Sequence, residues 1–335
     1  MQELIALKLG SSHTAIYKQG DGIVLFEPSL VAFSGVGKNK VIKAIGAKAK
    51  KISGRSADDT VTLSPIFEGT IQDVDLASQM LKHFLTKVFP HRIIKPRIKA
   101  IFLIPLGTKI EDRKAFLKVC YNAGLQEVSL IPSTICACIG YSLPISTPSG
   151  TLVVNIGGGS TDVAIISMSQ IVAGVNVGVG GEHLDVAIQR YILDKFNLVI
   201  SKSQAEMIKR EIGSLYPNDE SSTEVVGVDN DSKAQRTDVI YSKDIYNAIE
   251  HYYSCIADAI QGLINTCAPD IVADINNSGL YLLGGAAAIT GAEHYFRKKL
   301  NLKVTLQDNS NAMDVIGAGK LLSDFKLLKQ IESNL

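Results

Sequence analysis

Apolar and polar positions alternate in short runs along the N-terminal part of the chain, with turn residues between them. The runs cover Leu4–Leu9, His13–Lys18, Gly22–Glu27 and Leu30–Ser34. Alternation with a period of two is typical of a strand that has one buried face. The pattern therefore predicts a four-stranded β-meander at the start of the chain.

Further along, apolar positions recur at helical spacing between short, fully apolar runs. Asp73 and Ser242 are expected to be N-caps, and Gly124 a C-cap. The predicted helices cover residues 47–52, 74–89, 110–123, 134–140, 180–196, 202–212 and 243 to about 267. The predicted buried strands cover residues 100–104, 127–131 and 280–283, and a polar hairpin covers residues 224–240. This mixture predicts an α/β fold.

Glycine and proline residues mark the predicted loops and turns between these helices and strands. Residues 65–70 are expected to form a loop, and Gly317-Ala318-Gly319 a turn that opens a terminal helix. Residues 143–150 carry two prolines and a glycine and predict a crossover between two halves. The second half then opens like the first, with a strand, a glycine turn and a strand, which is a weak internal repeat.

The composition narrows the function classes. The chain has 335 residues, and its net charge of +1 argues against a general nucleic-acid-binding surface. Hydrophobic residues make up 46% and charged residues 20%, and no apolar run reaches the ~18 residues of a membrane span. The five cysteines have no metal-ligand spacing, and Cys136 and Cys138 are expected to pack as small hydrophobes. A reducing cytosol and no signal peptide are expected.

Three glycine-rich turns follow apolar strands. They contain Gly10-Ser11-Ser12, Gly157-Gly158-Gly159-Ser160-Thr161 and Gly284-Gly285-Ala286. Backbone N–H groups and hydroxyls in such turns can hold the phosphates of a nucleotide. A magnesium ion at the phosphates would call for a carboxylate at the head of the first two turns. Those positions hold Lys8 and Asn155.

Longer stretches carry a specific resemblance. Residues 22–32, 179–185 and 205–213 are very similar to stretches of the bacterial actins of the MreB/Mbl family, within the actin-like ATPase superfamily. The resemblance runs almost from end to end. It implies an actin-like, ribonuclease H-like duplicated fold of two lobes, with four subdomains around a nucleotide cleft.

The resemblance also implies limits for the lobes. The first lobe would cover residues 1–145, with subdomain IB at approximately 33–65. The second lobe would cover residues 146–312, with subdomain IIB at approximately 181–245. Residues 313–335 would form a C-terminal helix that returns to the first lobe.

The same resemblance assigns candidate contacts for ATP or ADP. The first phosphate loop maps to Gly10, Ser11, Ser12 and His13, and the second to Gly157, Gly158, Gly159, Ser160 and Thr161. Glu206 and Lys209 match positions beside the adenosine, and Gly284, Gly285 and Ala286 match the adenosine loop. From spacing alone, Glu206 and Lys209 would instead be an exposed i,i+3 pair on a helix.

The departures from the family concern the chemistry. The family carries Asp where this chain has Lys8 and Asn155, and a water-orienting Glu where it has Ser133. Phosphoryl transfer needs a metal to neutralise charge and a group to position water. We therefore expect nucleotide binding that depends little on magnesium, with weak or absent hydrolysis. Lys8 would supply charge to the phosphates; in the alternative, Lys8 points away and the cleft is empty.

Two other polar residues lie at the loops. Asp162 follows the second loop, at a position that is usually acidic in the family, so it is not expected to be a compensating metal ligand. His13 is expected to pack or to bond backbone and not to act in catalysis.

Residues 89–99 mix apolar and basic side chains. Phe89, Ile93 and Ile94 lie among cations, which suits a loop that contacts acyl chains and anionic head groups. The resemblance implies a membrane-contacting loop here; the alternative is a short loop that leads into a buried strand.

The resemblance implies an MreB-like cytoskeletal protein that determines cell shape. On the same ground it would form paired filaments with itself, and possible partners are other paralogues of the family and the inner face of the cell membrane, with no nucleic acid. Two alternatives stay open. One is an active ATPase with rearranged metal ligands, and the other is a non-polymerising adaptor with an actin fold.

Overall fold

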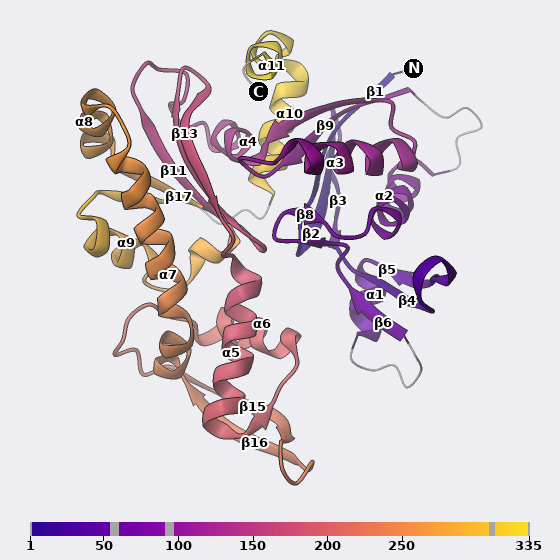
Figure 1. Ribbon diagram of the computed structural model, residues 1–335, viewed down its shortest axis with the longest axis vertical. Coiled ribbons are helices and arrows are strands. Elements are labelled where there is room, and N and C mark those ends of the chain that lie inside the picture. Colours follow the sequence, from indigo (N-terminus) through magenta and orange to yellow (C-terminus); the bar gives the residue numbers. More distant parts are fainter. Residues whose placement is uncertain (1, 54–59, 91–96, 308–311, 334–335) are drawn as a thin grey trace. The chain divides into compact units, whose positions relative to one another are not determined.

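The first sheet is built by the predicted meander together with two later strands. The computed structural model describes residues 2–53, 60–90, 97–307 and 312–333 (Figure 1). The sheet has the order β10-β9-β1-β2-β3, in which β1 runs antiparallel to β2 and parallel to β9. Its strands are β1 (Gln2–Leu9), β2 (His13–Lys18), β3 (Gly22–Pro28), β9 (Arg97–Ile104) and β10 (Glu127–Pro132).

The fourth predicted strand of the meander belongs elsewhere. β4 (Val31–Ser34) pairs with β5 (Val41–Ile45) and β6 (Thr60–Leu63) in a separate three-stranded sheet. The prediction of one four-stranded meander was therefore wrong. Pro28 ends β3, and the chain leaves the first sheet there. The helix α1 (Ala47–Ile52) packs against this small sheet, as predicted, and a 3-10 turn covers Gly37–Asn39.

Helices cover both faces of the first sheet. α2 (Val74–Val88) and α3 (Ile110–Ala123) lie side by side on one face, and α4 (Ser133–Gly140) and α10 (Met313–Ser323) pack on the other (Figure 1). Successive side chains of β1 point to opposite faces of the sheet, so the sequence of β1 determines which side chains meet the helices on each face. Ile5, Leu7 and Leu9 enter the apolar core with α2 and α3, whereas Lys8 points to the α10 side.

The capping residues predicted from the sequence mark the ends of two helices correctly and of one wrongly. The Asp73 side chain accepts a hydrogen bond of 2.9 Å from Leu76 N, and Gly124 ends α3 in the left-handed conformation at φ 99°. Ser242 was wrongly predicted as a cap, since it is the first residue of α7 (Ser242–Asn265) and Tyr241 holds the cap position. The predicted loop at residues 65–70 contains a small hairpin of β7 (Ile66–Phe67) and β8 (Thr70–Ile71).

The glycines near the C-terminus form no turn. Gly317 and Gly319 lie inside α10, so the prediction of a turn there was wrong. A Cβ on Gly317 would overlap the carbonyl oxygen of Cys136 and lie 2.6 Å from the nitrogen of Gly140, both in α4. A Cβ on Gly319 would lie 2.5 Å from the Tyr17 ring. The missing side chains let α10 lie directly on α4 and on the sheet.

The second five-stranded sheet has the order β13-β12-β11-β17-β18. β11 and β17 are parallel, with Asn155 in register with Leu283. The sequence did not predict β13. The strands are β11 (Thr151–Ile156), β12 (Thr161–Ser167), β13 (Gln170–Val177), β17 (Leu280–Leu283) and β18 (Val304–Leu306).

The remaining elements complete the second half. The predicted polar hairpin is formed by β15 and β16, with β14 at its side. The strands are β14 (Leu198–Val199), β15 (Ser222–Asp229) and β16 (Gln235–Tyr241). The helices are α5 (Gly181–Phe196), α6 (Lys202–Ile212), α8 (Pro269–Ser278), α9 (Ala292–Leu300), α11 (Phe325–Glu332) and a 3-10 turn at Gly285–Ala288.

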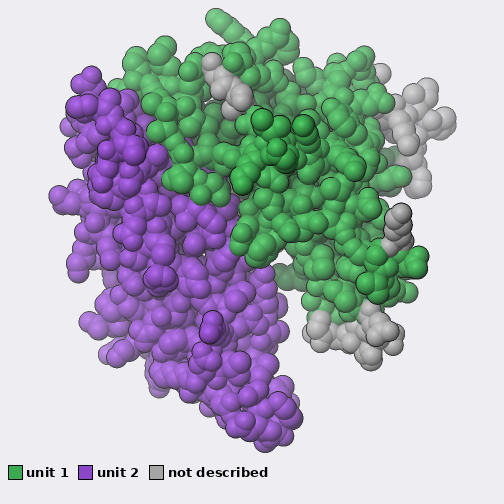
Figure 2. Space-filling model, in the orientation of Figure 1, with its two compact units in different colours: residues 1–149, 166–176, 311–335 green, residues 150–165, 177–310 purple. Residues whose placement is uncertain are grey.

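The chain divides into two compact units (Figure 2). Unit 1 contains residues 1–149, 166–176 and 311–335, and unit 2 contains residues 150–165 and 177–310. The first phosphate loop belongs to unit 1, and the second loop and the adenosine loop belong to unit 2. The lobe and subdomain limits expected from the resemblance stay predictions.

Cys136 and Cys138 pack as small apolar side chains, as predicted. Cys120, Cys136 and Cys138 are buried free thiols, and burial raises the pKa of Cys120 to about 12. Cys255 and Cys267 are half-buried free thiols. Within the described parts of the chain, none of the helices combines the length and the apolarity that crossing a membrane requires.

The contact between α10 and α4 predicts a sharp difference between two glycine substitutions. Gly317→Ala forces a methyl group into the backbone of α4 and should lower the free energy of unfolding by about 2 kcal/mol or more. Gly262→Ala is the matched control, because Gly262 lies in α7 with no atom within 4 Å of the added carbon. It should stabilise by about 0.5–1 kcal/mol. Chemical unfolding followed by circular dichroism measures both, and equal stability of the two variants would contradict the contact.

Candidate functional site

The first glycine turn joins β1 to β2 through a short backbone bond. Gly10 N donates to His13 O at 3.1 Å, and a Cβ on Gly10 would lie 2.9 Å from the same oxygen. Ser11 is buried, and Ser12 O accepts a hydrogen bond of 2.9 Å from Ser29 N. The turn is therefore held from both sides, and only a residue without a side chain fits easily at Gly10.

His13 is engaged in packing and local bonding. Its ring stacks on Phe26 with centroids 4.9 Å apart, and its Nδ1 lies 2.9 Å from the Ser12 hydroxyl. The residue thus stiffens the turn between β1 and β2.

The second glycine turn repeats this construction in unit 2. Gly157 N donates to Ser160 O at 2.9 Å, and a Cβ on Gly157 would lie 3.0 Å from that oxygen. A buried threonine follows each turn. Thr14 bonds the Ser29 hydroxyl at 2.9 Å, and Thr161 donates to Val179 O at 2.7 Å. The internal repeat seen in the sequence therefore extends to the bonds that close both turns.

The start of α5 fixes the second turn. Gly181 N donates to Gly157 O at 2.9 Å, and Glu182 N donates to Gly158 O at 2.8 Å. Gly180 comes so close that an added Cβ would lie 2.6 Å from both Gly158 O and Ser160 N. Gly158 and Ser160 are thus positioned by backbone contacts with the N-terminal end of α5.

Lys209 of α6 is tied to the same place. Its ammonium donates to Gly181 O at 2.6 Å and forms an ion pair of 2.6 Å with Asp185. The Lys209 side chain is only 13% exposed, so an exposed i,i+3 pair with Glu206 does not describe it. Glu206 forms an ion pair of 2.7 Å with Arg210.

The adenosine loop lies against the second turn. Gly284 has φ 95°, and a Cβ there would overlap Ile156 O and lie 2.7 Å from Asn155 Oδ1. A Cβ on Gly181 would lie 3.3 Å from Lys209 Nζ and 3.5 Å from Ala286 Cβ. Unit 2 therefore brings together its candidate residues from β11, α5, α6 and the loop after β17.

Asp185 is a member of this group that the sequence did not single out. It lies one helical turn after Gly181 and is buried. Burial raises the pKa of its carboxyl, and the charge of Lys209 opposes that rise. The sequence signal was a carboxylate on the same face of the predicted helix as the loop-binding glycine, at a spacing of four residues.

Lys8 is held by a partner from the far end of the chain. Its ammonium forms an ion pair of 2.5 Å with Asp314, the second residue of α10. Lys8 Cε would lie 3.6 Å from a Cβ on Gly10, so the lysine stem runs beside the first turn. An ammonium group donates hydrogen bonds and has no lone pair for a cation. The residue at this position therefore does not fit the magnesium ion that the family resemblance implies.

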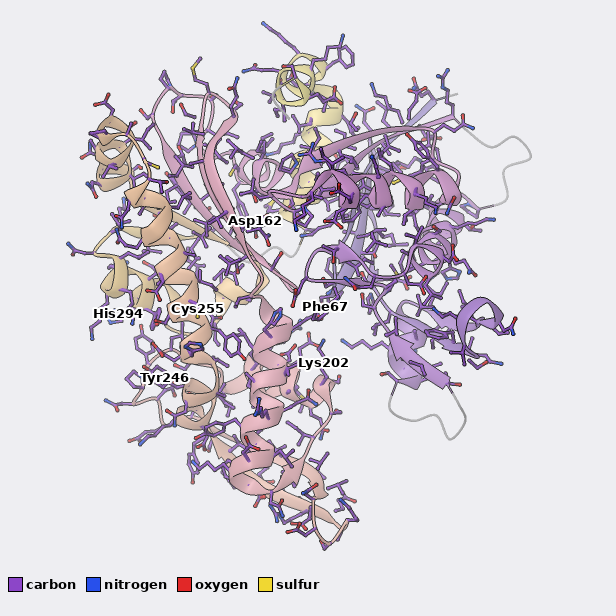
Figure 3. All side chains as sticks on the ribbon, in the orientation of Figure 1. Phe67, Asp162, Lys202, Tyr246, Cys255 and His294 are labelled. Atoms are coloured by element: carbon purple, nitrogen blue, oxygen red, sulfur yellow. The ribbon has the colours of Figure 1, made fainter. Side chains whose placement is uncertain are left out.

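Two further residues bear on the chemical step, Ser133 and Asp162. Ser133 is the first residue of α4 and is buried, with a hydroxyl where the resemblance expects a water-orienting carboxylate. Asp162 is buried in β12 directly after Thr161, and Figure 3 labels it. In the described residues, no three His, Cys, Asp or Glu side chains lie together as a possible metal site.

The membrane candidates divide into two groups. Phe89 is half-buried and packs against the core of α2, with the Lys18 ammonium 5.9 Å from its ring centroid. Ile93 and Ile94 lie outside the described residues. At the end of this segment, the Lys99 ammonium lies 4.9 Å from the ring centroid of Phe325, an exposed aromatic residue of α11.

Comparisons with known proteins give one family. The family model described as MreB/Mbl protein matches residues 2–330. The cell shape-determining protein MreB of Escherichia coli is 33% identical over 321 residues, which cover 95% of this chain and 92% of that protein. The cell shape-determining protein Mbl of Bacillus subtilis is 31% identical over 326 residues, 97% of each chain.

A solved structure matches over the full length. MreB5 of Spiroplasma citri bound to AMPPNP has a TM-score of 0.89 and 30% identity, and the match covers 100% of this chain and 99% of that one. The same protein bound to ADP gives a TM-score of 0.88 and 29% identity. The predicted actin-like fold is confirmed.

The pair of Lys209 and Asp185 predicts a pH-dependent loss of stability. Lys209→Met leaves a buried carboxylate without its counter-charge, which should lower the free energy of unfolding by about 3 kcal/mol at neutral pH. The folded state then holds the Asp185 proton more tightly than the unfolded state does. Stability therefore falls as pH rises above the ordinary aspartate pKa of 3.8.

Chemical unfolding at pH 5 and pH 8 measures this effect. Lys209→Met should be closer to the unaltered protein at pH 5 than at pH 8. The double variant Lys209→Met with Asp185→Asn carries no buried charge there and is the control. A loss for Lys209→Met that is equal at both pH values would show that its cause is packing and not charge.

Proposed function

The chain belongs to the MreB/Mbl family, and from this premise we propose that it is a filament-forming, nucleotide-binding bacterial actin with a role in cell shape. Its relatives include proteins named as cell shape-determining, and a solved relative is described with ADP and with AMPPNP bound. The observation that carries the proposal is the pair of equivalent turns, each closed by the same backbone bond.

Each unit supplies its own candidate phosphate contacts. In unit 1 these are Gly10, Ser11 and Ser12, and in unit 2 they are Gly158 to Thr161. Lys209 and Ala286 stand next to Gly181, where the resemblance expects the adenosine. The fixed shape of the turns supports this assignment, because donors that are already placed lose little freedom on binding.

Hydrolysis is proposed to be weak or absent. The position that should hold a metal carboxylate carries Lys8, and the second such position carries Asn155, whose amide is uncharged. The position of the water-orienting carboxylate carries Ser133, a poor base. Charge neutralisation and water positioning are the two main contributions to phosphoryl transfer, and both are reduced here.

Assembly and location complete the proposal. The protein would form filaments with itself, paired as the family resemblance implies, and it would lie on the inner face of the cell membrane. Other paralogues of the family are candidate partners in mixed filaments. Phe89, Ile93 and Ile94 are the proposed membrane contacts, with the basic residues of the same segment facing anionic head groups. Phe89 would take part only through the portion of its half-buried side chain that does not pack against the core.

Phosphate release during assembly tests the central part of this proposal. Purified protein with ATP and magnesium should sediment as filaments and release no phosphate above the buffer level. Steady release that stops in Asn155→Ala would instead support an active ATPase with rearranged metal ligands. Absence of sedimentation at every protein concentration would support the adaptor with an actin fold.

Vesicle binding tests the proposed location. The protein should sediment with vesicles that contain phosphatidylglycerol and should stay in the supernatant with phosphatidylcholine alone. The double change Ile93→Ser and Ile94→Ser should reduce that binding about tenfold, since apolar side chains leave the acyl region. Ile110→Ser, at an exposed position in the same unit, is the control. Equal binding of the unaltered protein and the Ile93/Ile94 variant would exclude this segment as the anchor.

A further inference from the structure

The ion pair between Lys8 and Asp314 places a second charge beside the first phosphate loop. We propose that Asp314 regulates nucleotide binding by holding the Lys8 ammonium as an internal counter-ion, for which metal-free nucleotide phosphate competes. The proposal rests on the proposed nucleotide binding. It adds a positioning residue, Asp314, and a ligand form, the nucleoside di- or triphosphate without a divalent cation.

The placement of Lys8 follows from the strand. β1 alternates between the two faces of the first sheet, and Lys8 falls on the face that α10 covers. Two residues later Gly10 begins the turn, and the lysine stem runs past it. The ammonium is thus close to the loop that would hold phosphate, and the charge is available from the protein itself.

Asp314 is the fixed member of the pair. Its side chain is 8% exposed, and its Oδ1 accepts a hydrogen bond of 2.8 Å from Val315 N. α10 cannot slide easily, because Gly317 lies directly on the backbone of α4. Lys8 is the adjustable member, since its side chain is 32% exposed and its stem is flexible.

The Lys8 ammonium and the Asp314 carboxylate carry opposite charges that cancel within the pair. With Asp314 ionised, the pair has no net charge, so phosphate meets an ammonium that is already shared and a carboxylate that repels it. With the carboxylate removed, the full charge of Lys8 faces the loop. A lysine can then serve phosphate as a point charge, in the place where the family resemblance expects a metal.

Binding of AMPPNP in the presence of EDTA tests the proposal by isothermal titration calorimetry. Asp314→Asn should bind about tenfold more tightly than the unaltered protein, because one like charge is removed and Lys8 is released. Lys8→Met should bind about tenfold more weakly. Asp314→Asn combined with Lys8→Met should match Lys8→Met alone, since Asp314 acts only through the lysine.

Two further variants separate charge from folding. Lys8→Arg keeps the charge and should retain most of the metal-free affinity. Lys18→Met removes another lysine of unit 1, which pairs with Asp21 at 2.6 Å in the turn between β2 and β3, and should change nothing. Circular dichroism confirms that each variant is folded.

The outcomes distinguish this inference from the proposed function. Unchanged affinity in Asp314→Asn, with weaker binding in Lys8→Met, overturns the role of Asp314 and leaves nucleotide binding intact. Loss of magnesium-dependent binding in Asp314→Asn also overturns it, because Asp314 would then be a metal ligand. Failure of the unaltered protein to bind AMPPNP with or without magnesium overturns both.

Discussion

The contact of α10 with α4 determines what surrounds the first phosphate loop. Gly317 meets the backbone of α4, and Gly319 meets the Tyr17 ring on the first sheet. A larger residue at either position would lift α10 away from the sheet. Asp314 lies less than one turn before Gly317 in the same helix, so the close contact also sets the place of its carboxylate. The packing of α10 on α4 therefore also determines which charge lies beside the first phosphate loop.

A similar relation holds in unit 2, where α5 takes the role of α10. Gly180 and Gly181 let the start of α5 touch the second turn, and Asp185 follows on the same helix. There the buried carboxylate pairs with Lys209, which also bonds the backbone of Gly181. In each unit a helix with close glycine contacts brings a buried aspartate to a lysine near a loop. The charge next to both loops is thus balanced inside the protein.

The sequence predicted local features well and distant ones poorly. Both glycine turns, the cap at Asp73 and the end of α3 at Gly124 depend on neighbouring residues, and all were placed correctly. Gly317 was misplaced because a glycine pair signals a turn or a close helix contact equally well, and only the partner helix decides. Lys8 and Asp314 are separated by 306 positions, and no pattern within one sequence connects them. Asp185 lies in the stretch 179–185 that carries the family resemblance, but its burial and its pairing with Lys209 depend on the fold.

The ion pair also changes how the substitution at Lys8 is understood. A lysine that merely replaced a metal carboxylate would add a positive charge to a loop of N–H donors, with nothing to offset it in the absence of nucleotide. The structure supplies the offset from α10, through a carboxylate that is itself fixed by Val315. The pair of Lys8 and Asp314 is neutral when no phosphate is bound, and the Lys8 ammonium can bind phosphate when it enters the loop. A lysine with a dedicated counter-ion is thus better explained by retained anion binding than by simple decay of a catalytic position.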